Sequence, residues 1–376
     1  MIVFFEILIW LLLLFSLLYF IVVAVFIYGW FTLKQDDFFD EASEKVSVVV
    51  AVRNEEKNIS GLLNALLHQT YSHQKFEIII VNDHSEDNTV KLIEDFSALN
   101  DTMNIKLLQV SGLGKKQAVS QGIKNSANRL ILTTDGDCVP PKRWIETMAG
   151  YFVKHRPRII LGAVAFWGEK SLKQRFFSLD FMSLVASGAG SAGAGLPFMG
   201  NAANMAFDKT VFNDFGQQQA YASGDDVFLI HWVKKHYGGK SIHFLKDVRA
   251  LVVTRPPEGW RVFLNQRLRW ASKAKGYYDG WSIMVSGVVL LFNLGLAALF
   301  FTGFLWSWMW IVWFLFVALK TLIDFPLISG YAQLAGKSGQ LIYLWAMELI
   351  YPFYITIAGI GSLFVKYSWK GRAGLR

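Results

Sequence analysis

Long apolar runs without charge lie at both ends of the chain and flank a polar middle. The first run is 27 residues long, lies between Glu6 and Lys34, and consists mainly of Leu, Ile, Phe and Val. Because about 20 apolar residues in a helix span the hydrocarbon core of a bilayer, this run predicts a transmembrane helix. It is too long for the apolar core of a signal peptide and lacks a basic start, which argues against a cleaved leader.

The apolar material after the middle is long enough for three more spans. Between Asp279 and Lys320 lie 40 uncharged residues, which allow two passes with a turn between them. A last apolar stretch, 341–365, is interrupted by Glu348 and Pro352. We therefore expect four transmembrane helices, one before and three after the polar middle.

The polar middle alternates strand-like runs with helix-like segments. Four short runs rich in Val, Ile and Leu are typical of buried strands and cover 45–52, 76–81, 105–110 and 129–134. Apolar residues at helical spacing follow each of the first three runs. This alternation predicts an α/β domain with a parallel sheet. In such sheets, ligands collect at the carboxyl ends of the strands.

Polar residues stand directly after these predicted strands, where a ligand is expected. They are Arg53, Asn54 and Glu55 after the first strand, Asp83 after the second, Lys115 after the third, and Asp135 and Asp137 after the fourth. Each has an ordinary explanation when taken alone, because Asp-Gly favours a tight turn, Asp near Ser caps a helix, and paired lysines form a solvated face. Their coincidence at four strand ends favours a site for a nucleotide and a hard cation.

The composition narrows the class of protein. Hydrophobic residues make up 53% of the chain and charged residues only 18%, which excludes a disordered chain and disfavours a wholly soluble one. The net charge of +8 favours contact with phosphates or anionic lipids. The basic residues are scattered without a nucleic-acid recognition module, which argues against nucleic acid as a partner. The single cysteine, Cys138, excludes an intrachain disulfide and fits a reducing compartment.

Motifs of other nucleotide-binding enzymes do not occur in their functional context. There is no Gly-x-x-x-x-Gly-Lys-Ser/Thr loop, which argues against an ATPase. One Gly-x-Gly-x-x-Gly occurs at 188–193, but it does not follow a predicted strand, which argues against a dehydrogenase. The seven histidines lack the spacing of metal ligands. A hard cation held by carboxylate and diphosphate oxygens fits the sequence better.

Three motifs occur in a defined order along the chain. They are Asp135-Gly136-Asp137, the acid pair Asp225-Asp226 after Gly224, and Gln266-Arg267-Leu268-Arg269-Trp270. With them, 45–275 resembles the catalytic domain of family-2 glycosyltransferases with the GT-A fold. The last motif, Q-x-x-R-W, is typical of members with an adjoining membrane domain, which include cellulose, hyaluronan and poly-N-acetylglucosamine synthases and ceramide glucosyltransferases.

The resemblance implies a domain organisation. It implies an α/β GT-A domain, a Rossmann-like nucleotide-diphospho-sugar transferase fold, inserted between transmembrane helices. The expected parts are an N-terminal transmembrane helix, a cytosolic GT-A domain, an amphipathic interfacial segment and a C-terminal membrane region of about three helices, at 1–33, 34–259, 260–281 and 282–376.

The resemblance also implies roles for individual residues. Asp226 matches the catalytic base, and its partner Asp225 stands where the family has Glu. Asp137 matches the acid that binds Mg²⁺ or Mn²⁺ through the donor diphosphate. The residues matched to nucleotide-sugar binding are Arg53, Asn54, Glu55, Asp83, Lys115, Asp135, Gln266, Arg269 and Trp270. Those matched to the lining of the donor sugar and acceptor are Gly200, Asn201 and Asn204.

These roles imply an inverting transferase. Asp226 is expected to activate the acceptor hydroxyl, while the cation and Arg269 offset the charge on the leaving diphosphate. The expected donor is a nucleotide diphosphate sugar, with UDP as the nucleotide, and the expected acceptor is a lipid-linked substrate or a glycan. A processive polysaccharide synthase is the alternative. A catalytically degenerate membrane scaffold would be expected to lack the acids at 137 and 226, and both are present.

The expected location is the cell membrane, with several spans and a cytosolic catalytic domain. Lys34 follows the first span and has no basic counterpart before it, which favours a cytosolic middle by the positive-inside rule. Three spans after a cytosolic middle would place the basic tail outside, against the same rule. The basic residues of the tail are Lys366, Lys370, Arg372 and Arg376. Either the last segment re-enters the membrane or the tail departs from the rule.

Three segments near the membrane leave alternatives open. The segment 260–281 alternates basic and apolar residues, which predicts an interfacial amphipathic helix in contact with membrane lipids. The glycine-rich stretch 183–200 is a poor helix former and is either a flexible connection or a loop that gates the acceptor. Lys320 and Asp324 are four residues apart, so they and Glu348 are expected to pair or to snorkel near the boundary.

Overall fold

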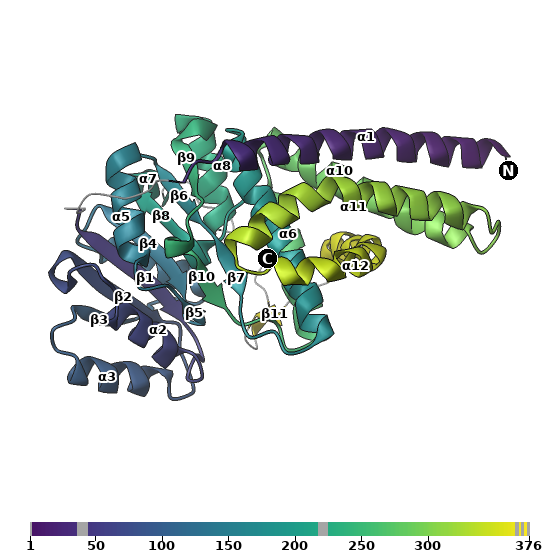
Figure 1. Cartoon of the computed structure of the whole chain (residues 1–376). Helices are drawn as coiled ribbons and strands as arrows, with labels where there is room; N and C mark the ends of the chain where they lie inside the picture. The colour runs from purple at the N-terminus through teal and green to yellow at the C-terminus, as the bar shows by residue number, and fades with distance from the viewer. Residues whose placement is uncertain (1, 36–43, 217–224, 365–367, 370–371, 374–376) are drawn as a thin grey trace. The chain divides into compact units, whose positions relative to one another are not determined.

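The computed structural model describes residues 2–35, 44–216, 225–364, 368–369 and 372–373 (Figure 1). The chain folds into two compact units that are interleaved along the sequence. Unit 1 contains 1–32, 169–194 and 256–375, and unit 2 contains 33–168 and 195–255. The basic tail residues Lys366, Lys370 and Arg376 lie outside the described residues.

Unit 2 is built on a mixed sheet with the strand order β3-β2-β1-β4-β8-β6-β9. The strands are β1 (Val46–Val52), β2 (Phe76–Asn82), β3 (Ile105–Gln109), β4 (Leu130–Asp135), β6 (Ile159–Gly162), β8 (Met205–Asp208) and β9 (Ile242–Leu245). The first four are parallel, as predicted. The sheet also contains β8, which was not predicted and which runs antiparallel to β4 and β6. This strand is four residues long, too short to show a pattern of its own.

Helices and a second small sheet complete unit 2. The helices are α2 (Ile59–Leu67), α3 (Thr89–Leu99), α4 (Lys115–Lys124), α5 (Trp144–His155), α7 (Lys209–Gly216) and α8 (Asp225–Tyr237). The small sheet contains β5 (Cys138–Val139), β7 (Val164–Phe166) and β10 (Val252–Thr254). Helix α4 packs closely on β1 and β2, because a Cβ at Gly122 would lie 2.5 Å from Val49 Cγ1 and 3.1 Å from Val81 Cγ2. β1 and β2 are almost wholly buried, which explains why their sequences are nearly continuous apolar runs.

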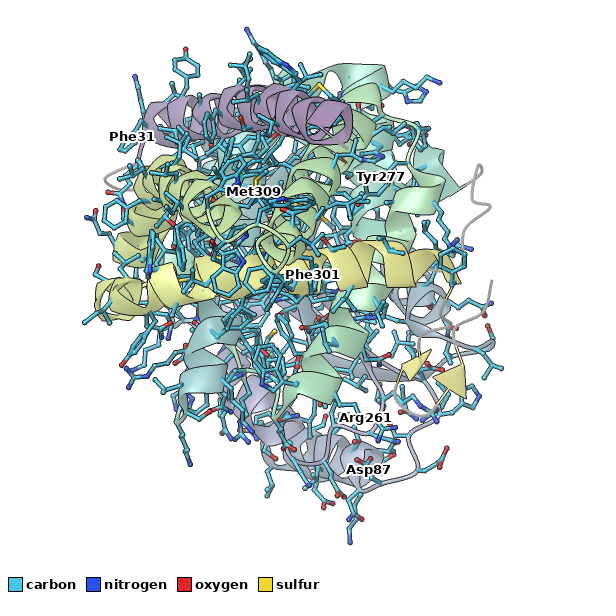
Figure 2. The ribbon with its side chains drawn as sticks, turned by 90° about the vertical axis from the view of Figure 1, so that its right-hand side faces the viewer. Phe31, Asp87, Arg261, Tyr277, Phe301 and Met309 are labelled. Carbon is cyan, nitrogen blue, oxygen red and sulfur yellow. The ribbon has the colours of Figure 1, made fainter. Side chains whose placement is uncertain are left out.

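Among the described residues of unit 1, four helices are long and apolar enough to cross a membrane, as predicted. They include α1 (Ile2–Thr32), α10 (Gly280–Thr302), α11 (Met309–Leu334) and α12 (Leu344–Phe364). Helices α1, α10 and α11 pack side by side (Figure 1). Large apolar side chains point outward from them, for example Phe31 on α1 and Phe301 on α10, which are 66% and 62% exposed (Figure 2). An exposed apolar surface on long helices is what a lipid environment requires.

The glycine-rich stretch is helical rather than a loop. Helix α6 (Leu172–Gly193) runs through most of 183–200, so the expectation of a flexible connection or gating loop is wrong there. Its glycines allow close contact with α1. A Cβ at Gly190 would lie 2.2 Å from the Phe26 carbonyl oxygen, and a Cβ at Gly29 would lie 1.8 Å from the Gly190 carbonyl oxygen. Packing against α1 therefore outweighs the low helix propensity of glycine.

The segment predicted to be one interfacial helix is shorter and partly buried. Helix α9 (Trp260–Ser272) is followed by the 3₁₀ turn η5 (Lys273–Gly276), and α10 begins at Gly280. Arg261 is exposed, as a basic interfacial face requires, but Arg267 is only 4% exposed. The basic pattern of 260–281 therefore includes at least one cation that belongs to the interior of unit 1.

The charges within the apolar helices form one buried cluster. Lys320 Nζ donates to Asp324 Oδ2 at 2.7 Å and to Glu348 Oε2 at 2.5 Å, and the Tyr19 hydroxyl donates to Asp324 at 2.8 Å. Lys320 is 1% exposed, so the expected pairing is confirmed and snorkelling is not. The cluster joins α1, α11 and α12 within unit 1.

Candidate active site

The residues after β1 support the loop that follows β2. The guanidinium of Arg53 is buried and donates to the backbone carbonyls of Asp83 at 2.9 Å and His84 at 2.7 Å. It also pairs with Glu86 at 3.0 Å. Asn54 has a positive φ of 51°, and its side-chain oxygen accepts the Glu86 N–H at 2.9 Å. Both side chains therefore hold two strand ends together.

Glu55 lies against the Asp-Gly-Asp turn. A Cβ at Gly136 would lie 3.0 Å from Glu55 Cγ and 3.1 Å from Val52 Cγ1, so the middle position of the turn favours glycine. Glu55 is buried, and its Oε2 accepts a hydrogen bond from Asn58 at 2.8 Å. The Glu55 side chain thus supports the turn that carries both acids of the motif.

Two contacts connect the remaining strand ends. Asp83 is buried, and its Oδ1 accepts the Gly114 N–H at 3.2 Å, which links the ends of β2 and β3. Lys115 Nζ donates to Asp135 Oδ1 at 2.5 Å, which links the start of α4 to the end of β4. The side chains of Lys115 and Asp135 are 35% and 30% exposed, so this ion pair remains accessible to a ligand.

Asp137 stands between β4 and β5. Its carbonyl oxygen accepts from the Thr254 hydroxyl at 3.3 Å, and its Oδ1 lies 3.8 Å from Cys138 Sγ. Burial and the charges of Asp137 and Asp135 raise the pKa of the Cys138 thiol well above its usual value.

The described residues contain no group of three or more His, Cys, Asp or Glu side chains that could hold a metal ion alone. A divalent cation at Asp137 fits this arrangement only if a bound ligand supplies further oxygen atoms. Hard cations accept such mixed sets of carboxylate and phosphate oxygens. The residues present therefore fit a cation that arrives with a diphosphate better than a permanently bound one.

Asp226 lies in the first turn of α8. Its Oδ1 accepts the Val227 N–H at 2.9 Å, and the residue is half-buried. The N-terminus of a helix favours a negatively charged side chain, so the ionised form of Asp226 is supported there. Asp225 is the first residue of α8, but its side chain, like Gly224, lies outside the described part of the structure.

The three residues matched to the sugar lining differ in their surroundings. Asn204 is fully buried, and its Nδ2 donates to the carbonyls of Ala163 and Ala250, both at 2.7 Å. Its Oδ1 accepts from Trp144 Nε1 at 2.8 Å, so the amide bonds extensively within the core. Asn201 is half-buried, and its Oδ1 caps the following turn at 3.0 Å. Asn204 therefore supports the segment, whereas Gly200 and Asn201 keep part of their surface open.

Parts of the sequence are similar to known proteins. Residues 47–201 match glycosyl transferase family 2. The chain is 29% identical over 215 residues to the glycosyltransferase AglE of Haloferax volcanii, with 56% of this chain and 67% of AglE covered. It is 27% identical over 247 residues to a poly-beta-1,6-N-acetyl-D-glucosamine synthase of Staphylococcus aureus, with 63% of this chain and 56% of the synthase covered. Residues 47–201 are therefore similar to glycosyl transferase family 2.

A solved structure extends the comparison to the fold. The mannosyltransferase PcManGT from Pyrobaculum calidifontis, determined in complex with GDP-Man and Mn²⁺, superposes with a TM-score of 0.60 at 17% identity. The superposition covers 95% of this chain and 99% of PcManGT. The GT-A fold with apolar helices on both sides in the sequence is therefore confirmed. The sequence matches to AglE and the synthase are shorter, and the latter spans little more than half of the synthase.

The residues of the Q-x-x-R-W motif belong to unit 1. Gln266, Arg269 and Trp270 lie on α9 and are half-buried, whereas the acids of the Asp-Gly-Asp turn belong to unit 2. Their assignment to nucleotide-sugar binding stays a prediction.

Sequence reasoning missed two residues with prominent roles in the described structure. Glu86 pairs with Arg53 at the end of β1, and Asp180 on α6 pairs with Arg267 on α9. The first lies in the polar loop VNDHSEDNT, so its acidic side chain beside Asp83 was a usable signal. Asp180 is separated from its partner by 87 positions, and no local pattern indicates such a pair.

Proposed function

We propose that the chain is an inverting hexosyltransferase that uses a nucleotide diphosphate sugar and transfers the sugar to a lipid-linked or glycan acceptor at the cytosolic face of a membrane. The observation that carries this proposal is the accessible Lys115–Asp135 pair beside Asp137, at strand ends of a family-2 glycosyltransferase domain. Four helices in the described part of the chain are suited to a membrane, which favours an acceptor that is itself membrane-bound.

The nucleotide diphosphate sugar is proposed to bind at the strand ends of unit 2. Arg53, Asn54 and Glu55 shape this surface through the loops that they support, and Asp83 anchors the next loop. The PcManGT structure contains a nucleotide sugar and Mn²⁺, which supports a similar donor and a divalent cation here. By resemblance to the wider family we take UDP as the first nucleotide to test, with GDP as the second.

Asp137 is the proposed ligand of Mg²⁺ or Mn²⁺, together with oxygens of the donor diphosphate. The cation would supply positive charge that stabilises the departing diphosphate. Lys115 fixes Asp135 next to it and adds a second positive charge at the same strand end. Preorganised charge of this kind is typically the largest electrostatic contribution to such a reaction.

The transfer step needs a base and no enzyme nucleophile. Asp226 accepts the proton of the acceptor hydroxyl as that oxygen bonds to the anomeric carbon. The bond from this carbon to the diphosphate oxygen breaks, and its electron pair leaves with the nucleoside diphosphate. A single displacement inverts the configuration at the anomeric carbon. The helix N-terminus at Asp226 favours the ionised form that the base requires.

The Q-x-x-R-W residues are proposed to contribute to donor binding. By resemblance, Arg269 offers a guanidinium to the leaving diphosphate, while Gln266 and Trp270 help to bind the nucleotide sugar. Gly200 and Asn201 remain the candidates for contact with the transferred sugar or acceptor, and Asn204 supports them from the core.

A processive polysaccharide synthase is the second candidate function. The similarity to a poly-beta-1,6-N-acetyl-D-glucosamine synthase favours it, although the match covers only 56% of that protein. A single transfer to a lipid needs no channel for a growing chain. We therefore place transfer to a lipid-linked acceptor first and polymer synthesis second.

A donor panel with the purified full-length protein in lipid nanodiscs tests the proposal. UDP- and GDP-sugars are supplied with Mn²⁺ and membrane lipid extract, and nucleoside diphosphate release and products are measured. A lipid carrying one added sugar supports single transfer, and a ladder of larger glycans supports a polymerase. No release with any donor, from protein that binds nucleotide, would favour the catalytically degenerate scaffold.

The proposed cytosolic orientation is tested by cysteine labelling. Cys138 is buried, so the unsubstituted chain is a low-background control for maleimide reagents. Glu94 lies exposed on α3 and offers an accessible position. We expect Glu94→Cys to react with a membrane-impermeant maleimide only after cells are permeabilised. Reaction in intact cells would place unit 2 outside.

A further inference from the structure

The Q-x-x-R-W helix contains a second arginine whose surroundings differ from those of the named motif residues. Arg267 is 4% exposed, whereas Gln266, Arg269 and Trp270 are half-buried. A guanidinium is always ionised in proteins, so a buried one requires a partner of opposite charge. The partner lies on another helix of unit 1.

Asp180 on α6 provides that partner. The Arg267 Nε donates to Asp180 Oδ2 at 2.6 Å, and a second guanidinium nitrogen contacts the same oxygen. The Tyr354 hydroxyl, from α12, donates to Asp180 Oδ1. Asp180 is fully buried and thus joins α6, α9 and α12 through its two oxygens.

Arg267 in turn contacts two of the named motif residues. Its guanidinium carbon lies 4.3 Å from the centre of the Trp270 ring and 4.6 Å from that of Phe263. Its Nη1 also donates to Gln266 Oε1 at 3.3 Å. Arginine over an aromatic face is an attractive contact, and positions i and i+3 lie on the same helix face. One buried guanidinium therefore orients both Gln266 and Trp270.

We infer that Asp180 and Arg267 are positioning residues for the Q-x-x-R-W motif: Asp180 fixes Arg267, and Arg267 fixes the orientation of Gln266 and Trp270. The inference rests on the proposed function, because it assigns these two side chains a task in donor binding. The pair acts through the motif and needs no contact with substrate.

Two variants and a matched control test this inference. Arg267→Lys keeps the charge but loses the planar group that stacks on Trp270. Asp180→Asn keeps the shape but removes the charge that holds the guanidinium. The control is Glu169→Gln, because Glu169 is also a carboxylate of unit 1 with a side chain only 7% exposed, paired with Lys337 at 2.6 Å and bonded to Ser178 on α6. No contact described for Glu169 reaches α9.

The rate of sugar transfer is measured in nanodiscs and divided by the amount of folded protein, which gives kcat and KM for the donor. Hydrogen exchange of the peptide 260–272 is measured on the same variants. We expect both variants to lower kcat/KM at least tenfold and to speed exchange in that peptide. Glu169→Gln should stay within twofold of the unsubstituted protein in both measurements. If Asp180→Asn yields no folded protein, Arg267→Lys decides the outcome.

Two results would overturn the inference. One is a kcat/KM within twofold of normal in Arg267→Lys, and the other is an equal loss in Glu169→Gln, which would indicate general destabilisation. Absence of transfer in the unsubstituted protein would instead refute the proposed function. In that case hydrogen exchange alone decides. Faster exchange of 260–272 in Arg267→Lys, but not in Glu169→Gln, would still support the positioning role. Unchanged exchange in Arg267→Lys would contradict it.

Discussion

The two units each contain a lysine–aspartate pair, and the pairs have opposite surroundings. Lys115 and Asp135 in unit 2 are about one-third exposed, and they lie beside the Asp-Gly-Asp turn. Lys320 and Asp324 in unit 1 are buried with Glu348 among apolar helices. Exposure leaves the first pair available to a ligand and limits what it adds to stability. Burial makes each ion of the second pair depend on its partners, because a buried charge left unpaired is costly.

This contrast predicts that substitutions at the candidate site of unit 2 lower activity, whereas substitutions in the buried charge cluster of unit 1 lower stability. The largest expected effect is at Asp226. Asp226→Asn should lower transfer by about 10²–10⁴-fold, because an amide cannot accept the acceptor proton. Nucleotide affinity should stay within a few-fold, since Asn caps a helix about as well as Asp. Nucleoside diphosphate release and nucleotide binding, measured on one preparation, check both statements.

A matched control for Asp226 lies in the same unit. Asp247 accepts the Arg249 N–H at 2.8 Å and caps a helical turn without a proposed catalytic role. Asp247→Asn should therefore leave turnover near normal. Turnover above one-tenth of normal in Asp226→Asn would rule out Asp226 as the base.

The next largest effect is expected at Lys320. Lys320→Met leaves two buried carboxylates without their cation, and breaking a buried ion pair in this way costs about 3–5 kcal/mol of folding free energy. The triple variant Lys320→Met, Asp324→Asn, Glu348→Gln removes all three charges and should recover most of that loss. Unfolding of the detergent-solubilised protein by increasing SDS measures both. If Lys320→Met is as stable as the unsubstituted protein, the expected difference between the two lysine–aspartate pairs is wrong.

A smaller effect is expected at the metal ligand. Asp137→Ala removes one carboxylate from the cation, so the affinity for UDP or GDP with Mn²⁺ should fall by roughly tenfold or more. Binding without metal should change little, because the carboxylate acts through the cation. Isothermal titration with and without Mn²⁺ separates the two cases. Asp101→Ala, at an exposed turn, is the control, and equal affinities in both variants would restrict Asp137 to a turn-forming role.

The smallest expected effect on stability is at the exposed pair. Lys115→Ala should change the free energy of unfolding by about 0–1 kcal/mol, because partly exposed ion pairs contribute little. Nucleotide affinity should nevertheless fall several-fold, since the positive charge beside Asp135 is lost. Denaturation and nucleotide titration on one sample test this. A loss of stability as large as that of Lys320→Met would show that exposure does not distinguish the two pairs.

The sequence pattern predicts the central strands well and the connections between helices poorly. The runs that became β1, β2 and β4 are buried on both faces, so their apolar character is visible without other information. The run that became β3 is only half-buried, at the edge of the sheet. The polar residues after them could be placed at one sheet edge by topology alone. The glycines of α6 show no local sign of a helix, because the residue that they closely contact, Gly29, lies about 160 positions away in the sequence.

The same limit applies to side chains in the candidate site. The type of Arg53 and Asn204 suggests contact with a ligand, but the structure shows both bonded mainly to backbone carbonyls of the protein. A sequence cannot show whether a polar group has its hydrogen bonds satisfied internally. Arg267 illustrates the converse, because a residue in a variable position of the motif proved to be buried and ion-paired.

The interleaving of the two units has a practical consequence for isolating the catalytic part. A fragment spanning 34–259 retains α6, which belongs to unit 1 although it lies between two segments of unit 2 in the chain. In the whole protein Phe177 of α6 stacks on Phe263 at 4.2 Å, and Gly190 packs against the backbone of α1. Cut away from these partners, α6 would present an apolar surface to water and promote aggregation. A water-soluble catalytic fragment would therefore have to omit 169–194 and join Gly168 to Gly195 through a polar linker.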